Sequence, residues 1–448
     1  MVSAAEQLAA NLNFSAIGKA EELKKRIWFT LGALLVYRLG TYIPIPGIDL
    51  EQLRSVFQGN GNGGSTILDQ LNLFAGGAIS RMAIFALNIM PYISASIIIQ
   101  LLTTVSPHLE QLKKEGEQGR KQINQYTRYG TVVLATIQAY GIAVGLEGST
   151  NNVVLDPGLF FRASTVITLV GGTVFLMWLG EQITARGIGN GISLIIFAGI
   201  VAELPGAIAS AFELSRRGTL SVPVLIILLV GIVAIIAVIV FMERAQRRLL
   251  VQYPKRQMGN RMAQGDNSHL PLKLNTAGVI PPIFASSLLL LPATFAAFGT
   301  SQSSEWFATI TAMLGRGQPL YLAIYVALII FFAFFYTAIV FNPEETADNL
   351  KKYGGFVPGI RPGTKTAEYI DYVLTRITVV GAIYLALVCV LPEYLQSYTA
   401  VSFALGGTSL LIVVSVTMDT VSQVQSHLLA HQYEGLIKKS KLRGSRRK

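Results

Sequence analysis

Long stretches of apolar residues, separated by shorter polar segments, dominate the pattern of this chain. Most stretches hold about twenty residues, the length that a helix needs to cross the hydrocarbon core of a bilayer. Helix is the expected conformation, because lipid offers no hydrogen-bond partner to an exposed backbone. The pattern predicts ten transmembrane helices, over residues 27–45, 82–104, 129–146, 163–180, 188–206, 220–242, 277–297, 320–341, 373–395 and 401–421.

One further apolar segment, between the first two predicted spans, is too short to cross a membrane. Its apolar residues recur at helical spacing, and Gly76 and Gly77 follow as a break. It is expected either as a re-entrant half-helix surrounded by protein or water, or as a helix lying on the outer membrane surface. Its apolar face consists of Ile67, Leu68, Leu71 and Phe74.

Prolines and polar residues interrupt some of the predicted spans. Pro91 lies in the second span, and Pro281 and Pro282 lie in the seventh, where proline removes backbone hydrogen bonds and favours a kink or hinge. Polar side chains within spans seek partners between helices, which is either ordinary helix packing or part of a movable interface. These polar residues are Ser94, Ser96, Gln100 and Asn190.

Composition and charge place the chain in a membrane with a defined orientation. Hydrophobic residues make up 52% of the 448 residues and charged residues 14%, which excludes an ordinary soluble protein. Of the 36 Lys and Arg residues, 29 fall on one side of the membrane when the predicted loops are assigned to alternate sides. The positive-inside rule then places both termini and the largest loops in the cytoplasm.

Ten spans divide into two halves of five with opposite orientation, as in proteins built from inverted repeats around a functional site. We therefore expect a cytoplasmic head at residues 1–26, an N-terminal half at 27–211, a C-terminal half at 212–422 and a basic cytoplasmic tail at 423–448. The C-terminal half carries cytoplasmic loops at about 243–276 and 342–372. These loops either obey the positive-inside rule and contact anionic lipid, or bind an acidic partner.

The spans lack the side chains that ion-coupled transport or catalysis would need. Carboxylates and histidines lie at span ends, in connections or in the tail, and no catalytic pair or phosphate-binding loop is present. Cys389 has no second cysteine, and His427, His431 and Glu434 have a metal-binding spacing but are expected on a surface helix. We therefore expect no enzyme activity, no metal and no cofactor. A secondary transporter of a small solute remains a rival to a channel, since it shares the inverted topology.

Motifs along nearly the whole chain resemble the SecY family, the channel subunits of the bacterial protein-export translocase. They occur in the family's order. The matching strings are YIPIPGID (Tyr42–Asp49), FAGGAISR (Phe74–Arg81), NIMPYISASIIIQLL (Asn88–Leu102), KKEGEQGRKQINQYTRYGT (Lys113–Thr131), GEQITARGIGNGISLIIFAGI (Gly180–Ile200), LPLKLNTAGVIPPIFASS (Leu270–Ser287), GGFVPGIRPG (Gly354–Gly363) and GGTSLLIVVSVTMD (Gly406–Asp419).

The resemblance implies an all-α polytopic membrane protein. Its ten transmembrane helices would form two pseudo-symmetric inverted halves of five, with a short re-entrant plug helix. It also implies a passive channel that passes unfolded secretory polypeptides across the membrane and releases hydrophobic segments sideways into lipid through a lateral gate. This chain departs from the family pattern by Pro282 directly after Pro281 and by a Gly/Asn-rich insertion at residues 59–64.

The resemblance further assigns roles to single residues. A narrow apolar collar excludes water and ions, yet it seals around a passing peptide. By motif position this pore ring is Ile89, Ile93, Ile196, Ile283 and Ile412. The plug, from about residue 66 to 81, includes Ile67, Leu68, Leu71, Phe74 and Arg81. The lateral gate includes Ser94, Gln100, Asn190, Pro281 and Pro282.

A docking surface for the motor ATPase SecA or the ribosome is implied at the two large cytoplasmic loops. Arg361 is expected to couple docking to movement, and Arg256 to contact ribosomal RNA phosphates. The other implied docking residues are Arg247, Arg248 and Lys255. Further implied partners are SecE, SecG, SecDF, YidC, signal sequences, nascent polypeptides and anionic lipids. The implied location is the bacterial inner (plasma) membrane.

Overall fold

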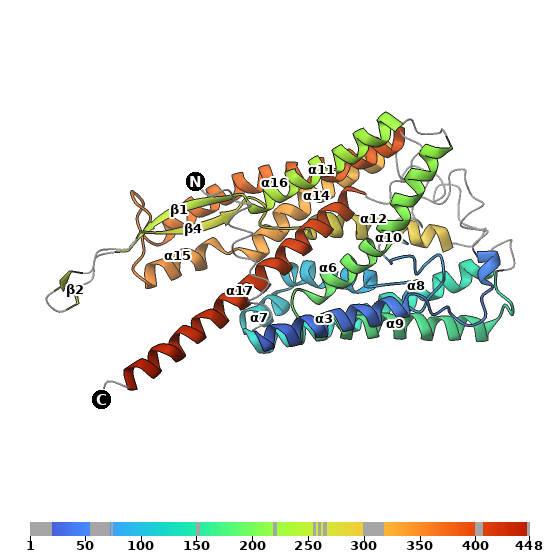
Figure 1. The fold of residues 1–448 in the computed structure, drawn as a ribbon, viewed down its shortest axis with the longest axis horizontal. Helices are drawn as coiled ribbons and strands as arrows, with labels where there is room; N and C mark the ends of the chain where they lie inside the picture. The colour runs from blue at the N-terminus through green and yellow to red at the C-terminus, as the bar shows by residue number, and fades with distance from the viewer. Residues whose placement is uncertain are drawn as a thin grey trace. The chain divides into compact units, whose positions relative to one another are not determined.

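The chain forms two compact units, each with its own helices. The first unit contains Met1–Gly206, Ala293–Ala308 and Val416–Lys448, and the second contains Ala207–Pro292 and Thr309–Ser415. The computed structural model (Figure 1) describes residues 20–53, 72, 75–148, 153–217, 222–253, 257–258, 261–262, 267–298, 318–398 and 406–445.

The first unit is built from helices. They are α3 (Glu21–Gly40), α6 (Met90–Val105), α7 (Pro107–Lys114), α8 (Glu117–Glu147), α9 (Leu159–Arg186), α10 (Gly191–Arg216) as far as Gly206, the end of α12 (Ile280–Phe298) from Ala293, and α17 (Gly407–Ser445) from Val416. α6 and α7 form one bent pair with an angle of 98° between them. The close packing of α8 on α6 and on α9 forms the centre of this unit.

The second unit combines helices with two short β-ladders. Its helices are the end of α10 from Ala207, α11 (Val222–Arg244), α12 as far as Pro292, α14 (Pro319–Val340), α15 (Pro343–Lys352), α16 (Thr364–Tyr398) and the start of α17. Its strands are β1 (Gln246–Gln252), β2 (Gln257–Met258), β3 (Arg261–Met262) and β4 (Asn267–Lys273). β1 pairs antiparallel with β4, from Gln246 opposite Lys273 to Gln252 opposite Asn267, and β2 pairs antiparallel with β3.

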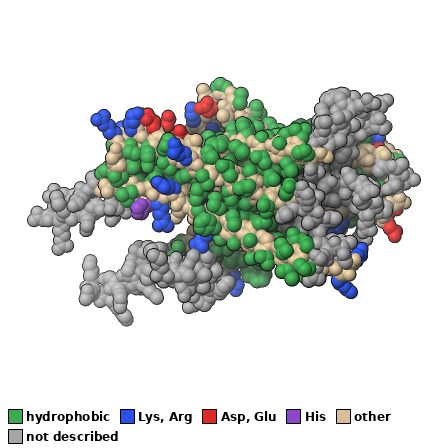
Figure 2. Space-filling view, turned by 90° about the horizontal axis from the view of Figure 1, so that it is seen from above, with side chains coloured by type: hydrophobic (Ala, Val, Ile, Leu, Met, Phe, Trp, Pro, Cys, Tyr) green, Lys and Arg blue, Asp and Glu red, His purple; other side chains and the backbone are tan. Residues whose placement is uncertain are grey.

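The helices account for the predicted membrane spans. Each of the ten predicted spans overlaps a helix in the described part of the chain. Seven of the described helices are long and apolar enough to cross a membrane, or eight if the bent pair α6–α7 counts as one broken span. Hydrophobic side chains cover much of the described surface that Figure 2 shows. The prediction of a helical multi-pass membrane protein is thus confirmed.

The prolines of the second and seventh spans do not kink their helices. α6 begins one residue before Pro91, and residues 82–89 form turns and an isolated bridge instead of helix. α12 likewise begins one residue before Pro281, so that Pro282 also lies in its first turn. A proline there removes no helical hydrogen bond, and its fixed φ suits a helix start. The expectation of kinks inside these spans is therefore wrong, because these prolines begin the helices.

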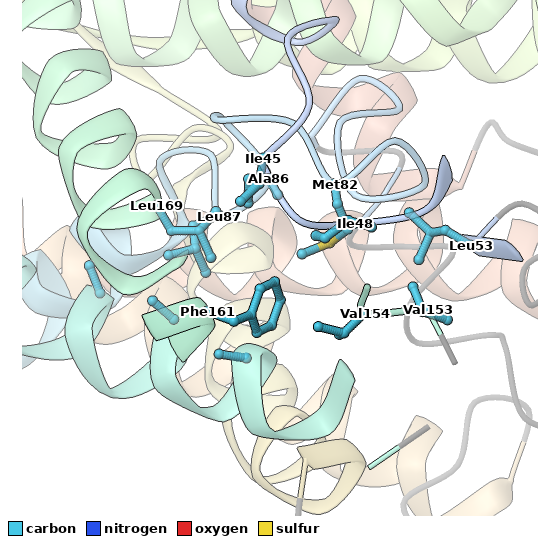
Figure 3. Packing of buried hydrophobic residues seen from close by; sticks show 13 residues of the cluster. Ile45, Ile48, Leu53, Met82, Ala86, Leu87, Val153, Val154, Phe161 and Leu169 are labelled. Carbon is cyan, nitrogen blue, oxygen red and sulfur yellow. The ribbon is translucent and has the colours of Figure 1, made fainter. Parts of the chain in front are cut away.

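A row of alanines joins α8 to the rest of the first unit. Ala135, Ala139 and Ala143 recur every four residues along α8, and each is 0% exposed. They belong to one apolar cluster with Phe161 and Leu169 of α9, and with residues of the chain after α3 (Figure 3). Such small side chains let helices approach closely, which is how helices pack in lipid.

The β1–β4 ladder is a difference from the sequence expectation of a loop. Along β1, the buried Leu249 and Val251 alternate with the exposed Arg248 and Leu250. This two-residue period is typical of a strand that buries one face. Leu249 packs in a cluster with buried residues of α16, so the ladder has a fixed base within the second unit.

Candidate functional site

The five isoleucines of the implied pore ring lie on four helices. Ile89 and Ile93 are one turn apart at the start of α6, where the Ile93 N–H donates to the Ile89 carbonyl oxygen at 3.0 Å. Both are buried, as is Ile196 on α10, and all three belong to the first unit. In the second unit, Ile412 on α17 is buried and Ile283 on α12 is half-buried. The closure of the five side chains into one ring stays a prediction.

The implied plug lies partly outside the described residues. The structure does describe residues 75–89, here named the turn segment, which consist of turns and an isolated bridge before α6. The start of this segment is tied to Asn72: the Gly77 N–H donates to its carbonyl oxygen and the Ser80 N–H to its Oδ1, both at 2.9 Å. The plug residues outside the described part are Ile67, Leu68, Leu71 and Phe74.

The turn segment pairs with the chain that follows α3. The Ile45 N–H donates to the Met82 carbonyl oxygen at 2.9 Å, and the Ile84 N–H donates to the Ile43 carbonyl oxygen at 3.0 Å. Met82 and Asn88 have φ of 39° and 49°, which residues other than glycine rarely adopt. Strain of this kind persists only where the surroundings hold it. The pairing with residues 43–45 supplies such support on the path to α6.

The implied gate side chains have local partners. Ser94 is buried in α6, and Gln100 donates from Nε2 to Ser96 Oγ at 3.4 Å, one turn earlier on the same helix. Asn190 is exposed and precedes α10, where its Oδ1 accepts from the Ile192 N–H at 3.1 Å as an N-cap. Among the described hydrogen bonds, none joins Ser94 or Gln100 to Asn190. A shared gate contact between these residues stays a prediction.

A buried clamp that the sequence analysis missed holds the start of α12. Asn275 is 4% exposed and donates from Nδ2 to Glu243 Oε1 at 2.7 Å and to the Gly278 carbonyl oxygen at 3.1 Å. The Leu274 N–H donates to the Ala245 carbonyl oxygen at 3.0 Å. The Asn275–Glu243 clamp thus ties the chain before α12 to the end of α11. The sequence predicts a turn at this Asn, because a glycine follows it, but it does not predict the partner of the Asn, which is 32 residues away.

The two implied docking loops are joined by their backbones. Gln252 of β1 and Phe356 of the GGFVPGIRPG segment exchange two backbone hydrogen bonds, of 2.9 and 3.0 Å. Next to this bridge, a Cβ on Gly355 would lie 3.0 Å from the Tyr253 ring and 3.1 Å from the Val251 side chain. The two loops therefore form one continuous structure, here named the joined loops.

Exposed guanidinium groups lie on the joined loops. Arg247 and Arg248 are exposed on β1, and Arg361 is exposed at the end of the second loop. The Arg361 carbonyl oxygen accepts from Thr366 Oγ1 at 2.9 Å, which ties its backbone to the first turn of α16. Guanidinium groups bind carboxylates and phosphates in two-pronged geometry. The implied docking residues Lys255 and Arg256 lie outside the described residues.

No group of three His, Cys, Asp or Glu side chains that would suit a metal ion occurs in the part of the chain that the structure describes. The side chains of His431 and Glu434 lie outside that part. Their spacing with His427 therefore stays a sequence pattern.

Known proteins match this chain over nearly its whole length. The SecY family model matches residues 83–421. The chain is 57% identical over 436 residues to the protein translocase subunit SecY of Rickettsia bellii (strain RML369-C), which covers 97% of this chain and 100% of that protein. It is 56% identical over 433 residues to the protein translocase subunit SecY of Escherichia coli (strain K12), covering 96% of this chain and 97% of that protein.

Solved structures of low sequence identity share the fold. One, described as the structure of a protein conducting channel, has a TM-score of 0.66 at 16% identity and covers 90% of this chain and 92% of that chain. Sec61 in a canine ribosome–channel complex has a TM-score of 0.62 at 16% identity over the same shares of the two chains. Because a family model matches most of its length and relatives match it almost completely, this chain belongs to the SecY family.

Proposed function

We propose that the chain is the central protein-conducting channel of a Sec translocon. It passes unfolded secretory polypeptides across the membrane and releases hydrophobic segments sideways into lipid. The observation that carries this proposal is the 57% identity to a SecY translocase subunit over the full length of that protein. The channel is passive and not an enzyme, so a partner supplies the energy by ATP hydrolysis or by protein synthesis.

The isoleucine ring is the proposed seal of this channel. Isoleucine side chains around a narrow constriction repel water, and ions cannot cross a dewetted pore. The burial of Ile89, Ile93, Ile196 and Ile412 supports this role, because Ile98, an isoleucine of α6 outside the ring, is 41% exposed. Residues 66–81 are the proposed plug, which closes the pore at rest.

The proposed lateral gate uses α6 and α8 together with α12 and α14. An apolar signal sequence would replace polar contacts of Ser94, Gln100 and Asn190 and so shift the gate toward its open state. One observation supports a change of partners at Gln100: its Oε1 is buried without a hydrogen-bond partner among the described residues. Pro281 and Pro282 contribute by setting where the gate helix α12 begins.

The joined loops are the proposed docking surface for SecA or a translating ribosome. Arg361, Arg247 and Arg248 offer exposed guanidinium groups on a base held by backbone hydrogen bonds. Lys255 and Arg256 add positive charge to the same loop by sequence. A related fold, Sec61, has been solved on a ribosome, which supports this class of partner.

The remaining partners and the location are proposed from the family. SecE and SecG would accompany the channel, with SecDF and YidC as further partners and anionic lipids along the basic loops. The bacterial inner membrane is the proposed location, with both termini in the cytoplasm. The uneven distribution of Lys and Arg supports this orientation, since 29 of 36 fall on that side.

Protein transport in vesicles tests the proposed function. The purified chain with SecE and SecG is reconstituted in liposomes, and SecA, ATP and a secretory precursor are added. We expect precursor to become protected from protease inside the vesicles, and vesicles without the chain to protect none. If no precursor is protected while a small solute accumulates inside, the channel proposal is wrong and the transporter alternative replaces it.

A further inference from the structure

Arg38 attaches the end of α3 to the turn segment, within the first unit. Its Nη1 donates to the Gly76 carbonyl oxygen at 2.7 Å, and its Nη2 donates to the Tyr42 hydroxyl at 2.9 Å. The guanidinium is thus held on both arms. A hydrogen bond from a charged donor is about twice as strong as a neutral one, so this is a firm attachment for a segment made of turns.

The Gly76–Gly77 turn fits closely between Arg38 and α10. Both glycines have positive φ, of 62° and 78°, which side chains rarely tolerate. A Cβ on Gly76 would lie 3.0 Å from the Gly199 Cα and 3.2 Å from Arg38 Nη1, and a Cβ on Gly77 would lie 2.5 Å from Glu203 Oε1. Backbone conformation and space therefore both require glycine at this turn.

Opposite charges surround the same turn. The guanidinium groups of Arg81 and Arg38 lie 4.3 and 4.8 Å from the centre of the Tyr42 ring, a cation–π geometry. Arg81 Nη2 and Glu203 Oε1 both lie within 3.2 Å of the point where a Gly77 Cβ would be. Arg81 Nη1 is buried with no hydrogen-bond partner among the described residues. The Tyr42 ring therefore interacts with the Arg81 guanidinium, and the Glu203 carboxylate lies beside the same turn.

We propose that Arg38, Tyr42 and Glu203 form a latch that retains the plug in the closed pore by holding the Gly76–Gly77 turn. The latch rests on the proposed function, because it requires that residues 66–81 form the plug. When the plug moves, this turn leaves Arg38 and α10. Its acceptor is a neutral carbonyl oxygen, so the contact is weaker than an ion pair and water in the open pore replaces it. The latch therefore sets how often the plug leaves without a substrate.

Ion conductance of the chain with SecE and SecG in planar bilayers tests the latch. Arg38→Gln removes the charge and the two-armed contact, and we expect the open fraction without substrate to rise about tenfold or more. Arg38→Lys keeps the charge but not both contacts, so an intermediate rise is expected. Arg217→Gln is the matched control, because the exposed Arg217 pairs with the exposed Glu213 at 3.7 Å, and no rise is expected.

A variant that lacks residues 66–74 separates the latch from the proposed function. If this deletion conducts while Arg38→Gln stays as silent as the parent, the plug exists and the latch is wrong. If the deletion variant conducts no ions even with a signal peptide present, the proposal of a plugged channel is wrong, and the latch proposal is wrong with it.

A second variant serves if Arg38→Gln melts well below the parent protein and is therefore destabilised. Glu203→Gln keeps the size of the side chain and removes its charge. It is expected to raise the open fraction severalfold, and an unchanged open fraction would refute the latch.

The rate of thiol labelling measures how accessible the turn segment is to a reagent in water. Ser80 lies in the turn segment and donates its hydroxyl to the Gly77 carbonyl oxygen at 3.0 Å, and Cys389 is the one cysteine of the chain. In a Cys389→Ala background, Ser80→Cys is expected to react with a membrane-impermeant maleimide about tenfold faster when Arg38→Gln is present. Equal labelling rates, in protein whose deletion variant conducts, overturn the latch.

Discussion

Two glycines of α10 differ in the space available to a side chain, and this difference predicts opposite effects of the same substitution. A Cβ on Gly191 would overlap the Gly180 carbonyl oxygen of α9, whereas no atom of the described residues lies within 4 Å of a Cβ on Gly206. Gly191→Ala is expected to lower the free energy of unfolding by about 1–3 kcal/mol, because the backbone must shift. Gly206→Ala is expected to raise it by about 0.5–1 kcal/mol. Thermal melting in detergent measures both, and equal melting of the two variants would contradict the packing of α10 on α9.

Two ion pairs between α8 and α9 differ in exposure, which predicts a difference in their contribution to stability. The Glu147 side chain is 9% exposed and accepts from Arg162 Nε at 2.7 Å and from the Gly158 N–H at 3.1 Å. The Glu181 side chain is 36% exposed and pairs with Arg128 at 2.7 Å. Water competes for an exposed pair, whereas loss of a buried carboxylate leaves its partners unsatisfied. We expect Glu147→Gln to lower the Tm more than Glu181→Gln does, and a larger effect of Glu181→Gln would refute this order.

Single functional residues are the least predictable part of the site. Ile89 and Ile93 lie in a helix with many apolar residues, so that only their place in a family motif identifies them. Arg38 and Glu203 stand near predicted span ends, and no local pattern shows that both contact one turn. Arg38 is 38 residues from Gly76 in the chain. Contacts between residues so far apart in the chain form only when the chain folds, so no local sequence pattern predicts them.

Whole helices were more predictable than residues, because lipid leaves the backbone few alternatives. Each span that hydropathy predicted overlaps a helix, although residues 82–89 of the second span form turns before α6. The errors in the predicted elements came from local backbone preferences, which hydropathy does not include. Pro91 and Pro281 begin helices instead of bending them, and the alternation of Leu249 and Val251 with exposed neighbours went unrecognised as a strand.

The Asn275–Glu243 clamp predicts how the start of α12 responds to charge. Asn275→Asp places a second carboxylate against Glu243, where the present N–O distance is 2.7 Å. We expect this variant to lose about 1–3 kcal/mol of stability, because a donor becomes a like charge. Adding Glu243→Gln supplies a donor again and is expected to restore part of the loss. The Tm of the two single variants and the double variant measures the coupling, and additive losses would show that the clamp does not act as a pair.

The second unit contains a continuous run of contacts from the joined loops to α12, a helix of the proposed lateral gate. The Arg361 loop bonds to β1 through Gln252 and Phe356, β1 pairs with β4, and β4 leads through the Asn275–Glu243 clamp into α12. If a partner binds at Arg361, as proposed, any displacement of this loop also acts on β1, because the two backbones are hydrogen-bonded to each other. We infer that the bridge at Phe356 carries the proposed docking to α12, and transport by bridge variants measures this coupling.

Phe356→Pro tests that bridge without changing any charge. Proline lacks the N–H that donates to the Gln252 carbonyl oxygen at 3.0 Å, whereas Phe356→Ala keeps it. Losing one such bond costs about 1 kcal/mol, so we expect SecA-driven transport into vesicles to fall severalfold in Phe356→Pro and to stay near the parent in Phe356→Ala. Arg361→Glu should abolish transport in the same assay, because it reverses the charge of the proposed docking residue while leaving the bridge intact. Equal transport by the proline and alanine variants would contradict the inference that the bridge at Phe356 carries docking to α12.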